Sequence, residues 1–237
     1  MLKRSEINNA IRRMERLAEE NGFALPPFCR WTPADWAGKG HGYDEIRDNM
    51  LGWDVTDYGL GEFDKTGFTL ITLRNGNVSR ADRYPKPYAE KLLMLEEGQY
   101  SPMHFHWHKM EDIINRGGGS ILIRVYNSTP EETFADTDVN VCKDGRSYYV
   151  KAGTQVRLDP GESITIYPCL YHDFEVVPGT GPVLLGEVSM CNDDQNDNRF
   201  YQPMGRFPKI DEDESPYRLL CTEYPPPGND PPGITDT

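Results

Sequence analysis

The chain of 237 residues is long enough for one sizeable core with extensions, and we expect a single domain. Its formal net charge of -13 repels phosphate backbones and anionic lipid, which argues against nucleic-acid and membrane-surface partners and favours a neutral or cationic ligand. No apolar run approaches the roughly 20 residues of a membrane span, and the start of the chain lacks a signal-peptide core. The five cysteines include no C-x-x-C pair, so reduced thiols in a soluble, cytoplasmic protein are expected.

An amphipathic helix is predicted from Ser5 to about Glu20, with Ser5 placed to cap its first turn and Gly22 to end it. Apolar residues recur there at helical spacing: Ile7, Ile11, Met14 and Leu17. Residues 23–65 are rich in Gly, Pro, Trp and Asp and show no sustained periodicity. We expect them to form ordered loops around the rest of the domain.

Short strands separated by turns are predicted between about residues 67 and 190. The segments are GFTLITLR, YAEKLLMLEE, SILIRVYN, TQVRL, SITIYP and PVLLGEVSM, and Asn75-Gly76 after the first is a hairpin signal. Strands that follow one another without intervening helices indicate an all-β sandwich or barrel. The tail EYPPPGNDPPGITDT has little to bury, so its last residues are expected to be disordered or draped over a neighbour.

Four side chains in two segments have the spacing of a metal site. Side chains two apart on a strand point to one face, so His104 and His106 can present two imidazoles to one point. Glu111 lies five residues beyond His106, far enough for a turn and the start of the next strand to bring its carboxylate back to that point. His172, in the segment GESITIYPCLYH, supplies a ligand from a distant strand. Three imidazoles and a carboxylate suit a divalent transition ion and leave two positions open if it is six-coordinate.

The pattern G-x5-H-x-H-x4-E-x6-G from Gly98 to Gly118 resembles the first cupin motif, and Pro168 with His172 resembles the second. The second motif departs from the common spacing, because Pro168 and His172 are one residue closer and the usual glycine is missing. The resemblance implies a cupin double-stranded β-helix, a jelly-roll barrel, with an N-terminal α-helix and long ordered loops. We divide this one domain into residues 1–66 (helix and wrapping loops), 67–206 (cupin barrel with the metal site) and 207–237 (a partly disordered extension).

Three segments resemble one particular family of cupins, the bacterial D-lyxose isomerases. They are EKLLMLEEGQYSPMH, HFHWHKMEDIINRGGG and GEVSMCNDDQNDNRF. This family resemblance covers about residues 85–205. It implies a cupin aldose-ketose isomerase that converts D-lyxose to D-xylulose and D-mannose to D-fructose. It also implies Mn²⁺ as the metal, with Co²⁺, Fe²⁺ or Zn²⁺ as alternatives, and a homodimer.

Glu187 and Lys109 are the predicted catalytic residues. Glu187 lies in the apolar strand VLLGEVSM, where its same-face neighbours suggest partial burial, and burial would raise its pKa toward that of a useful general base. Lys109 lies between two predicted ligands and is included in the isomerase resemblance, so we expect it to reach a substrate oxygen. Together they would move a proton between C1 and C2 through a cis-enediol. A metal-assisted hydride shift is the alternative chemistry.

Four further residues are predicted to bind the sugar: Lys91, His108, Asp197 and Arg199. Lys91 belongs to the first matching segment. A strand that turns toward Glu111 would carry His108 out of ligand range into the pocket wall. Asp197 and Arg199 belong to the polar run NDDQNDNR, which can hydrogen-bond sugar hydroxyls.

Two other classes of function use the same ligand set. A cupin dioxygenase would need air and a redox-active metal, whereas a non-catalytic sugar-binding cupin would bind sugar without turnover. The segments HWHKMED and NDDQNDNRF favour the isomerase.

Overall fold

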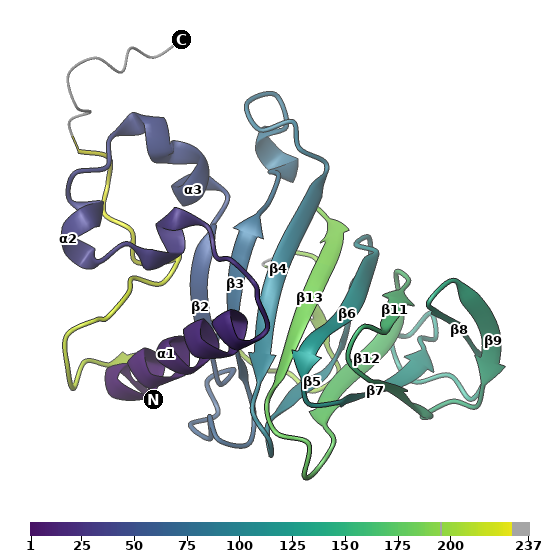
Figure 1. The fold of residues 1–237 in the computed structure, drawn as a ribbon. Coiled ribbons are helices and arrows are strands. Elements are labelled where there is room, and N and C mark those ends of the chain that lie inside the picture. Colours follow the sequence, from purple (N-terminus) through teal and green to yellow (C-terminus); the bar gives the residue numbers. More distant parts are fainter. Residues whose placement is uncertain (195, 229–237) are drawn as a thin grey trace.

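Two antiparallel β-sheets that face each other across one hydrophobic core form most of the structure (Figure 1). The computed structural model describes residues 1–194 and 196–228. The all-β prediction is confirmed, and the two-layered arrangement is that of a jelly roll with few helices. Among the described residues, no helix is both long and apolar enough to cross a bilayer.

The larger sheet has eight strands, each antiparallel to its neighbours. In spatial order they are β2 (Gly52–Thr56), β3 (Phe68–Arg74), β4 (Tyr88–Leu95), β13 (Val183–Met190), β6 (Glu111–Gly118), β11 (Ser163–Ile166), β8 (Val139–Lys143) and β9 (Arg146–Val150). Because β13 inserts between β4 and β6, Glu187 lies opposite Lys91 on one side and Ile113 on the other.

The smaller sheet has five strands and is also antiparallel. In spatial order they are β10 (Gln155–Leu158), β7 (Ile121–Asn127), β12 (Leu170–Val176), β5 (Tyr100–Phe105) and β14 (Arg199–Phe200). Its central pairing places His172 of β12 directly opposite His104 of β5. Residues 68 positions apart in the chain are thereby brought to one point on the inner face.

The N-terminal helix α1 (Arg4–Glu20) covers the outer face of β2, β3 and β4 (Figure 1). Its apolar residues Ile7, Ile11 and Met14 are fully buried against that face. The helix prediction is confirmed, but Ser5 as N-cap is wrong. Lys3 is the N-cap, and Ser5 lies inside the first turn, where its backbone N–H and hydroxyl donate to Asp213.

The C-terminal segment up to residue 228 returns to this helix. Strand β15 (Ile210–Asp211) pairs in parallel with β1 (Leu2–Lys3), and Leu220 is buried in the core beneath α1. Arg4, almost fully buried, lies between the carboxylates of Glu212, at 2.7 Å, and Glu223. The disorder predicted for the last residues of the tail concerns residues 229–237, which lie outside the described residues.

Arg4→Met is expected to lower the free energy of unfolding by about 2 kcal/mol. The substitution removes a buried cation and leaves two carboxylates facing each other, but the exposure of Glu212 reduces the cost below that of a fully buried pair. Urea unfolding followed by circular dichroism measures it. Arg13→Met is the matched control, because the ion pair of Arg13 with Glu96 is partly exposed and should contribute less than about 1 kcal/mol. Equal effects of the two substitutions would contradict this account.

The segment 23–65, predicted to be loop throughout, contains several regular elements. They are η1 (Pro27–Arg30), α2 (Pro33–Trp36), η2 (His41–Tyr43), α3 (Asp44–Asp48) and the strand β2. The loop prediction is wrong for β2. All five of its residues are buried, because the sheet core covers one face and α1 the other. A strand covered on both faces lacks the alternation by which strands are recognised.

The tight hairpin turn predicted at Asn75-Gly76 is also wrong, because the connection between the two strands is longer. Strands β3 and β4 do pair, but residues 75–87 connect them and include η3 (Val78–Arg80). Gly76 is needed here for a close approach: a Cβ atom at this position would lie 1.7 Å from the carbonyl oxygen of Lys86. A glycine required for packing thus resembled a glycine required for a turn.

Candidate metal centre

Three buried histidines gather on the inner face of the smaller sheet. His104 lies near the end of β5, His106 just beyond that end, and His172 on β12. Each places one ring nitrogen within 4.8 Å of the other two. The three side chains can therefore hold one metal ion.

Backbone carbonyls orient all three rings. The Nδ1 atoms donate to the carbonyl oxygens of Pro102 for His104 (2.8 Å), Asp197 for His106 (2.6 Å) and Leu170 for His172 (2.9 Å). Since the carbonyl can only accept, the proton of a neutral ring sits on Nδ1, and the Nε2 lone pair is directed into the site. This is the arrangement typical of metal-bound histidines.

Glu111, the first residue of β6, lies beside these nitrogens. Its Oε1 lies 3.2 Å from His172 Nε2, and its Oε2 lies 3.7 Å from His106 Nε2. His172 Nε2 is buried without a hydrogen-bond partner among the described residues, so its lone pair faces a carboxylate oxygen. Two acceptors in that position repel each other, and a bound cation removes the repulsion. The four side chains therefore fit a divalent transition metal.

The protonation states of this cluster also suit a metal. Burial lowers the pKa of His104 well below its usual value, and burial together with Lys109 lowers the pKa of His106 to about 4, so both rings are neutral near pH 7. Burial alone would raise the pKa of Glu111, but the charge of Lys109 outweighs it and keeps that pKa well below its usual value. Neutral imidazoles and an ionised carboxylate are the forms that bind metals.

Lys109, Glu187 and Lys91 form a buried chain of charges next to Glu111. Lys109 Nζ lies 2.6 Å from Glu111 Oε2 and 2.9 Å from Glu187 Oε1, and Lys91 Nζ lies 3.3 Å from the same Glu187 oxygen. Despite its burial, the two carboxylates raise the pKa of Lys109 above its usual value, so it is a cation. The two lysine charges offset the cost of burying the Glu187 carboxylate. Strand alternation alone did not reveal these partners.

The turn before His172 explains the missing glycine of the second motif. Leu170 donates to the carbonyl of Tyr167, and Cys169 between them has a φ of 60°, a conformation more often taken by glycine. The backbone N–H of Cys169 also donates to the carbonyl of His106 at 2.7 Å. The shortened motif therefore still joins the His172 turn to the end of β5.

The residues predicted to bind sugar lie in different places. Lys91 lines the space around the histidines, which we call the metal pocket, with a volume of about 40 Å³. His108 is exposed, and its backbone N–H donates to Asp197. Arg199 lies 2.6 Å from Glu132 and does not line the metal pocket. Alternation along a turning chain could not predict these orientations.

Asp197 holds the backbone that carries His106, one of the predicted ligands. Its carboxylate accepts from the N–H groups of His108 (3.0 Å) and Lys109 (2.8 Å), and its carbonyl accepts from His106. It therefore contacts the ligand segment, although a sugar hydroxyl was its predicted partner.

Asp197→Ala is expected to weaken metal binding by roughly 10-fold, because it releases the turn that positions His106 and Lys109. Calorimetric titration of metal-free protein with Mn²⁺ measures the change. Asp213→Ala is the control, since Asp213 makes the same kind of backbone contact at the start of α1. An unchanged affinity in Asp197→Ala would contradict this role.

The metal pocket also has walls that the motifs did not indicate. Asp194 and Arg206 line one side, Asn198 and Phe200 another, and Tyr58 comes from the N-terminal segment. Asp194 lies in the polar run, but no spacing rule singles it out. Arg206 and Tyr58 lie in loops whose contacts are distant in sequence, so no local signal could find them.

Comparisons with known proteins identify the family to which this chain is similar. A family model described as D-lyxose isomerase matches residues 2–224. A D-lyxose/D-mannose isomerase of Escherichia coli O157:H7 is 46% identical over 224 residues, 94% of this chain and 98% of the relative, and one of Serratia proteamaculans is 45% identical over the same shares. The solved structure of Geodermatophilus obscurus L-ribose isomerase is 14% identical, covers 89% of this chain and 98% of its own, and has a TM-score of 0.57, which shows a shared fold.

Proposed function

This chain belongs to the D-lyxose isomerase family and is an aldose-ketose isomerase, and we propose that it converts D-lyxose to D-xylulose and D-mannose to D-fructose in the metal pocket. The observation that carries the proposal is the group of inward-directed Nε2 atoms and the Glu111 carboxylate beside Lys109 and Glu187. Isomerisation needs a Lewis acid at the carbonyl and a group that carries a proton between C1 and C2. His104, His106, Glu111, Lys109 and Glu187, which would serve these two needs, line one pocket.

We propose that His104, His106, Glu111 and His172 hold Mn²⁺, with Co²⁺, Fe²⁺ or Zn²⁺ as substitutes. When bound, the ion supplies charge that polarises the sugar carbonyl and stabilises a developing enediolate. In this proposal the segments 1–66, 67–206 and 207–237 contribute differently to the site. All four ligands and both proton-transfer residues come from 67–206, while the N-terminal part contributes the pocket wall at Tyr58.

Glu187 acts as the base in this proposal, and Lys109 as the cation at a sugar oxygen. Glu187 Oε1 lies between two ammonium groups, so the carboxylate is held in one position on the inner face. From there it removes the proton from C2 of the aldose and returns it to C1 on the same face of a cis-enediol, while the proton of the C2 hydroxyl passes from O2 to O1. Lys109 donates a hydrogen bond to the oxygen on which negative charge develops.

Isomerisation in heavy water separates proton transfer from a hydride shift. Proton transfer through Glu187 is expected to place solvent deuterium in the ketose, because the protonated carboxyl group can exchange with solvent at the enediol stage, before it returns the proton to C1. Mass spectrometry of D-xylulose formed from D-lyxose measures it. Complete absence of deuterium would remove the proposed role of Glu187 and favour the hydride shift.

The dioxygenase and sugar-sensor alternatives predict different products. The isomerase reading predicts D-xylulose from D-lyxose under argon, in the presence of Mn²⁺ and with no oxygen consumed. A dioxygenase would need air, and a sensor would bind D-lyxose without forming ketose. Ketose formation under argon is therefore the direct test, and its absence with sugar bound would overturn the proposed function.

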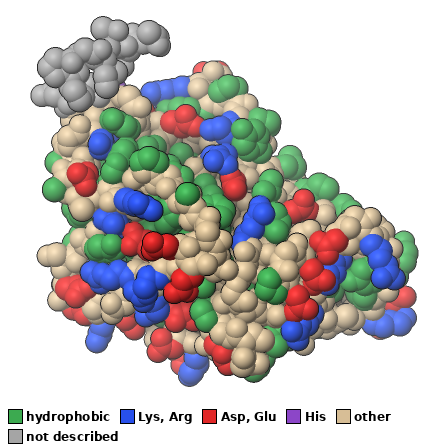
Figure 2. Space-filling view, viewed as in Figure 1, with side chains coloured by type: hydrophobic (Ala, Val, Ile, Leu, Met, Phe, Trp, Pro, Cys, Tyr) green, Lys and Arg blue, Asp and Glu red, His purple; other side chains and the backbone are tan. Residues whose placement is uncertain are grey.

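We also propose a cytoplasmic homodimer. The free state of all five cysteines supports a reducing compartment. Exposed apolar side chains of Tyr88, Val188 and Met190 gather on the outer face of β4 and β13, near Met110, and Figure 2 shows hydrophobic atoms at the surface over the upper ends of these strands. A second copy of the chain would cover this patch.

Sedimentation velocity tests the dimer. The wild-type chain is expected to sediment at twice its mass and Met190→Glu as a monomer, because a charge would be buried at the interface. Tyr149→Glu is the control, since Tyr149 is equally apolar and 73% exposed but lies on the distant β8–β9 hairpin. A monomeric wild-type protein, or a dimeric Met190→Glu, would contradict this interface.

A further inference from the structure

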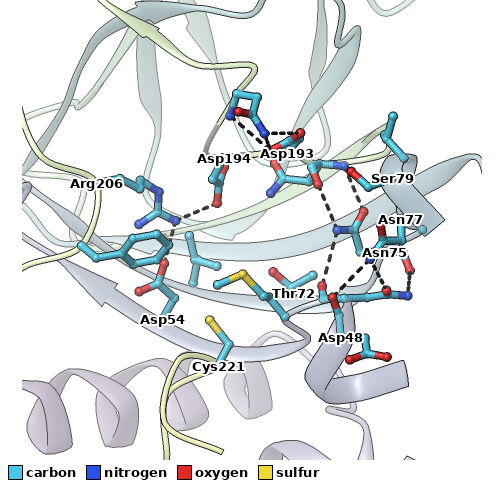
Figure 3. A pocket seen from close by; sticks show the side chains of 18 residues that line it. Asp48, Asp54, Thr72, Asn75, Asn77, Ser79, Asp193, Asp194, Arg206 and Cys221 are labelled. Carbon is cyan, nitrogen blue, oxygen red and sulfur yellow. Dashed lines mark hydrogen bonds and ion pairs between the residues drawn. The ribbon is translucent and has the colours of Figure 1, made fainter. Parts of the chain in front are cut away.

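A second, larger cavity adjoins the metal pocket. It has a volume of about 220 Å³, and we call it the distal cavity. Leu70, Asp194 and Arg206 line both spaces, and Asp54 lines the distal cavity. Figure 3 shows Arg206 extending between two carboxylates, with its Nη2 at 2.6 Å from Asp54 and 3.1 Å from Asp194. A single ion-pair network thus forms the boundary between the metal pocket and the distal cavity.

One buried polar atom at this boundary, and one hydroxyl inside the distal cavity, lack hydrogen-bond partners within the described part of the chain. The Nη1 atom of Arg206 is buried without one. Thr72, which is 6% exposed and lies in Figure 3 between the Arg206 network and Asn75, makes no side-chain hydrogen bond there. Buried polar groups in native proteins are nearly always paired. Unpaired groups that line a cavity are therefore suited to a ligand that carries hydroxyls.

A row of polar side chains leads from the metal pocket to this cavity. In the larger sheet, Glu187 on β13 lies directly opposite Lys91 on β4, and Lys91 lies directly opposite Thr72 on β3. Paired residues point to the same face of the sheet, and neighbouring strands lie about 4.8 Å apart, so Thr72 is about 10 Å from Glu187 along the inner face. A sugar chain whose C1 and C2 lie at Glu187 can extend along this row into the distal cavity.

We propose that the distal cavity binds the far end of the open-chain sugar, that Thr72 and Arg206 select for its length, and that the carboxylates of the cavity select for its neutrality. This inference rests on the isomerase function proposed above. Four carboxylates line the cavity, those of Asp48, Asp54, Asp193 and Asp194, while the charge of Arg206 is already paired with two of them, Asp54 and Asp194. Neutral hydroxyls can be hydrogen-bonded there, whereas a phosphate with a charge of about -2 would be repelled.

Thr72→Val tests the inference by sugar length. It replaces the hydroxyl by a methyl group at nearly constant volume, and the loss of one hydrogen bond reduces kcat/KM by roughly five- to tenfold. We expect this loss for D-mannose, a smaller one for D-lyxose, and a change within about twofold for the four-carbon aldose with the same configuration at C2 and C3. Arg206→Lys, which keeps the charge but removes Nη1, is expected to give the same order.

Thr69→Val is the matched control. Thr69 lies on the same strand but on the opposite face, toward α1, and lines neither space, so its substitution should leave the three sugars equally affected. D-mannose 6-phosphate provides a test that needs no variant: the wild-type protein is expected to convert it at least about 100-fold less efficiently than D-mannose, because the phosphate would enter a cavity lined by carboxylates.

The outcomes separate the inference from the function on which it rests. Equal losses for all three sugars in both boundary variants, no loss in either, or efficient conversion of D-mannose 6-phosphate would overturn the inference alone. No conversion of any aldose by the wild-type protein would overturn the proposed function and the inference with it.

Discussion

Glu187→Gln is expected to lower kcat for D-lyxose by about 10³-fold, within the range by which a positioned general base accelerates proton transfer. Glutamine has nearly the same shape and can still contact Lys109 and Lys91, but it cannot accept the proton from C2. Since Glu187 is not among the proposed ligands, Mn²⁺ affinity should stay within about threefold of the wild type. Initial rates on metal-saturated protein and calorimetric metal titration measure the two quantities.

Glu175→Gln is the control for this substitution. Glu175 is also a strand carboxylate, but it is exposed on β12 and pairs with Gln155. Its substitution should leave kcat unchanged. A Glu187→Gln variant that retained more than a tenth of the wild-type kcat would show that another group moves the proton.

His106→Ala is expected to weaken Mn²⁺ binding by at least about 100-fold and to abolish isomerisation at micromolar metal. Removal of a ligand should exceed the 10- to 100-fold effects known for groups that only support ligands. His108→Ala is a closely matched control, because His108 is two residues away but exposed, with its ring outside the metal pocket. Calorimetric titration of both metal-free variants gives the comparison. Equal losses in the two variants would contradict the assignment of His106 as a ligand.

Much of the fold could be predicted from the sequence, because alternation and turn residues mark strands with one buried face. β6 shows this alternation directly, with Glu111, Ile113 and Asn115 buried and the residues between them more exposed. The signal failed for β2, where α1 buries the second face, and at Gly76, where a packing contact resembled a turn. Both failures come from tertiary contacts that no local pattern contains.

The residues of the candidate site could also be predicted only in part, and local patterns again account for the successes. The spacing of His104, His106 and Glu111 is local to one strand and turn, and the structure brings these residues together with His172. Arg199 and His108 lie in the same segments as site residues, but their side chains turn away, toward Glu132 and toward solvent. A motif indicates which segment reaches a site, whereas rotamers and neighbouring loops decide which side chains enter it.

The ion-pair network between the metal pocket and the distal cavity could not be predicted from the sequence. Arg206 and Asp54 are separated by more than 150 positions in the chain and meet at 2.6 Å. Neither belongs to a recognisable motif, because Arg206 lies in a loop and Asp54 in the middle of β2, and their positions relative to each other depend on the complete fold. Residues of this kind would determine which sugar is accepted, while the motif residues would determine the reaction.

Metal-dependent conversion of D-lyxose by chelator-stripped protein under argon tests whether the four proposed ligands hold a catalytic ion. We expect no D-xylulose without metal and full restoration by one Mn²⁺ per chain, because His104, His106, Glu111 and His172 lie together at one point. Undiminished D-xylulose formation by the metal-free protein, or bound Mn²⁺ without any ketose formation, would contradict it.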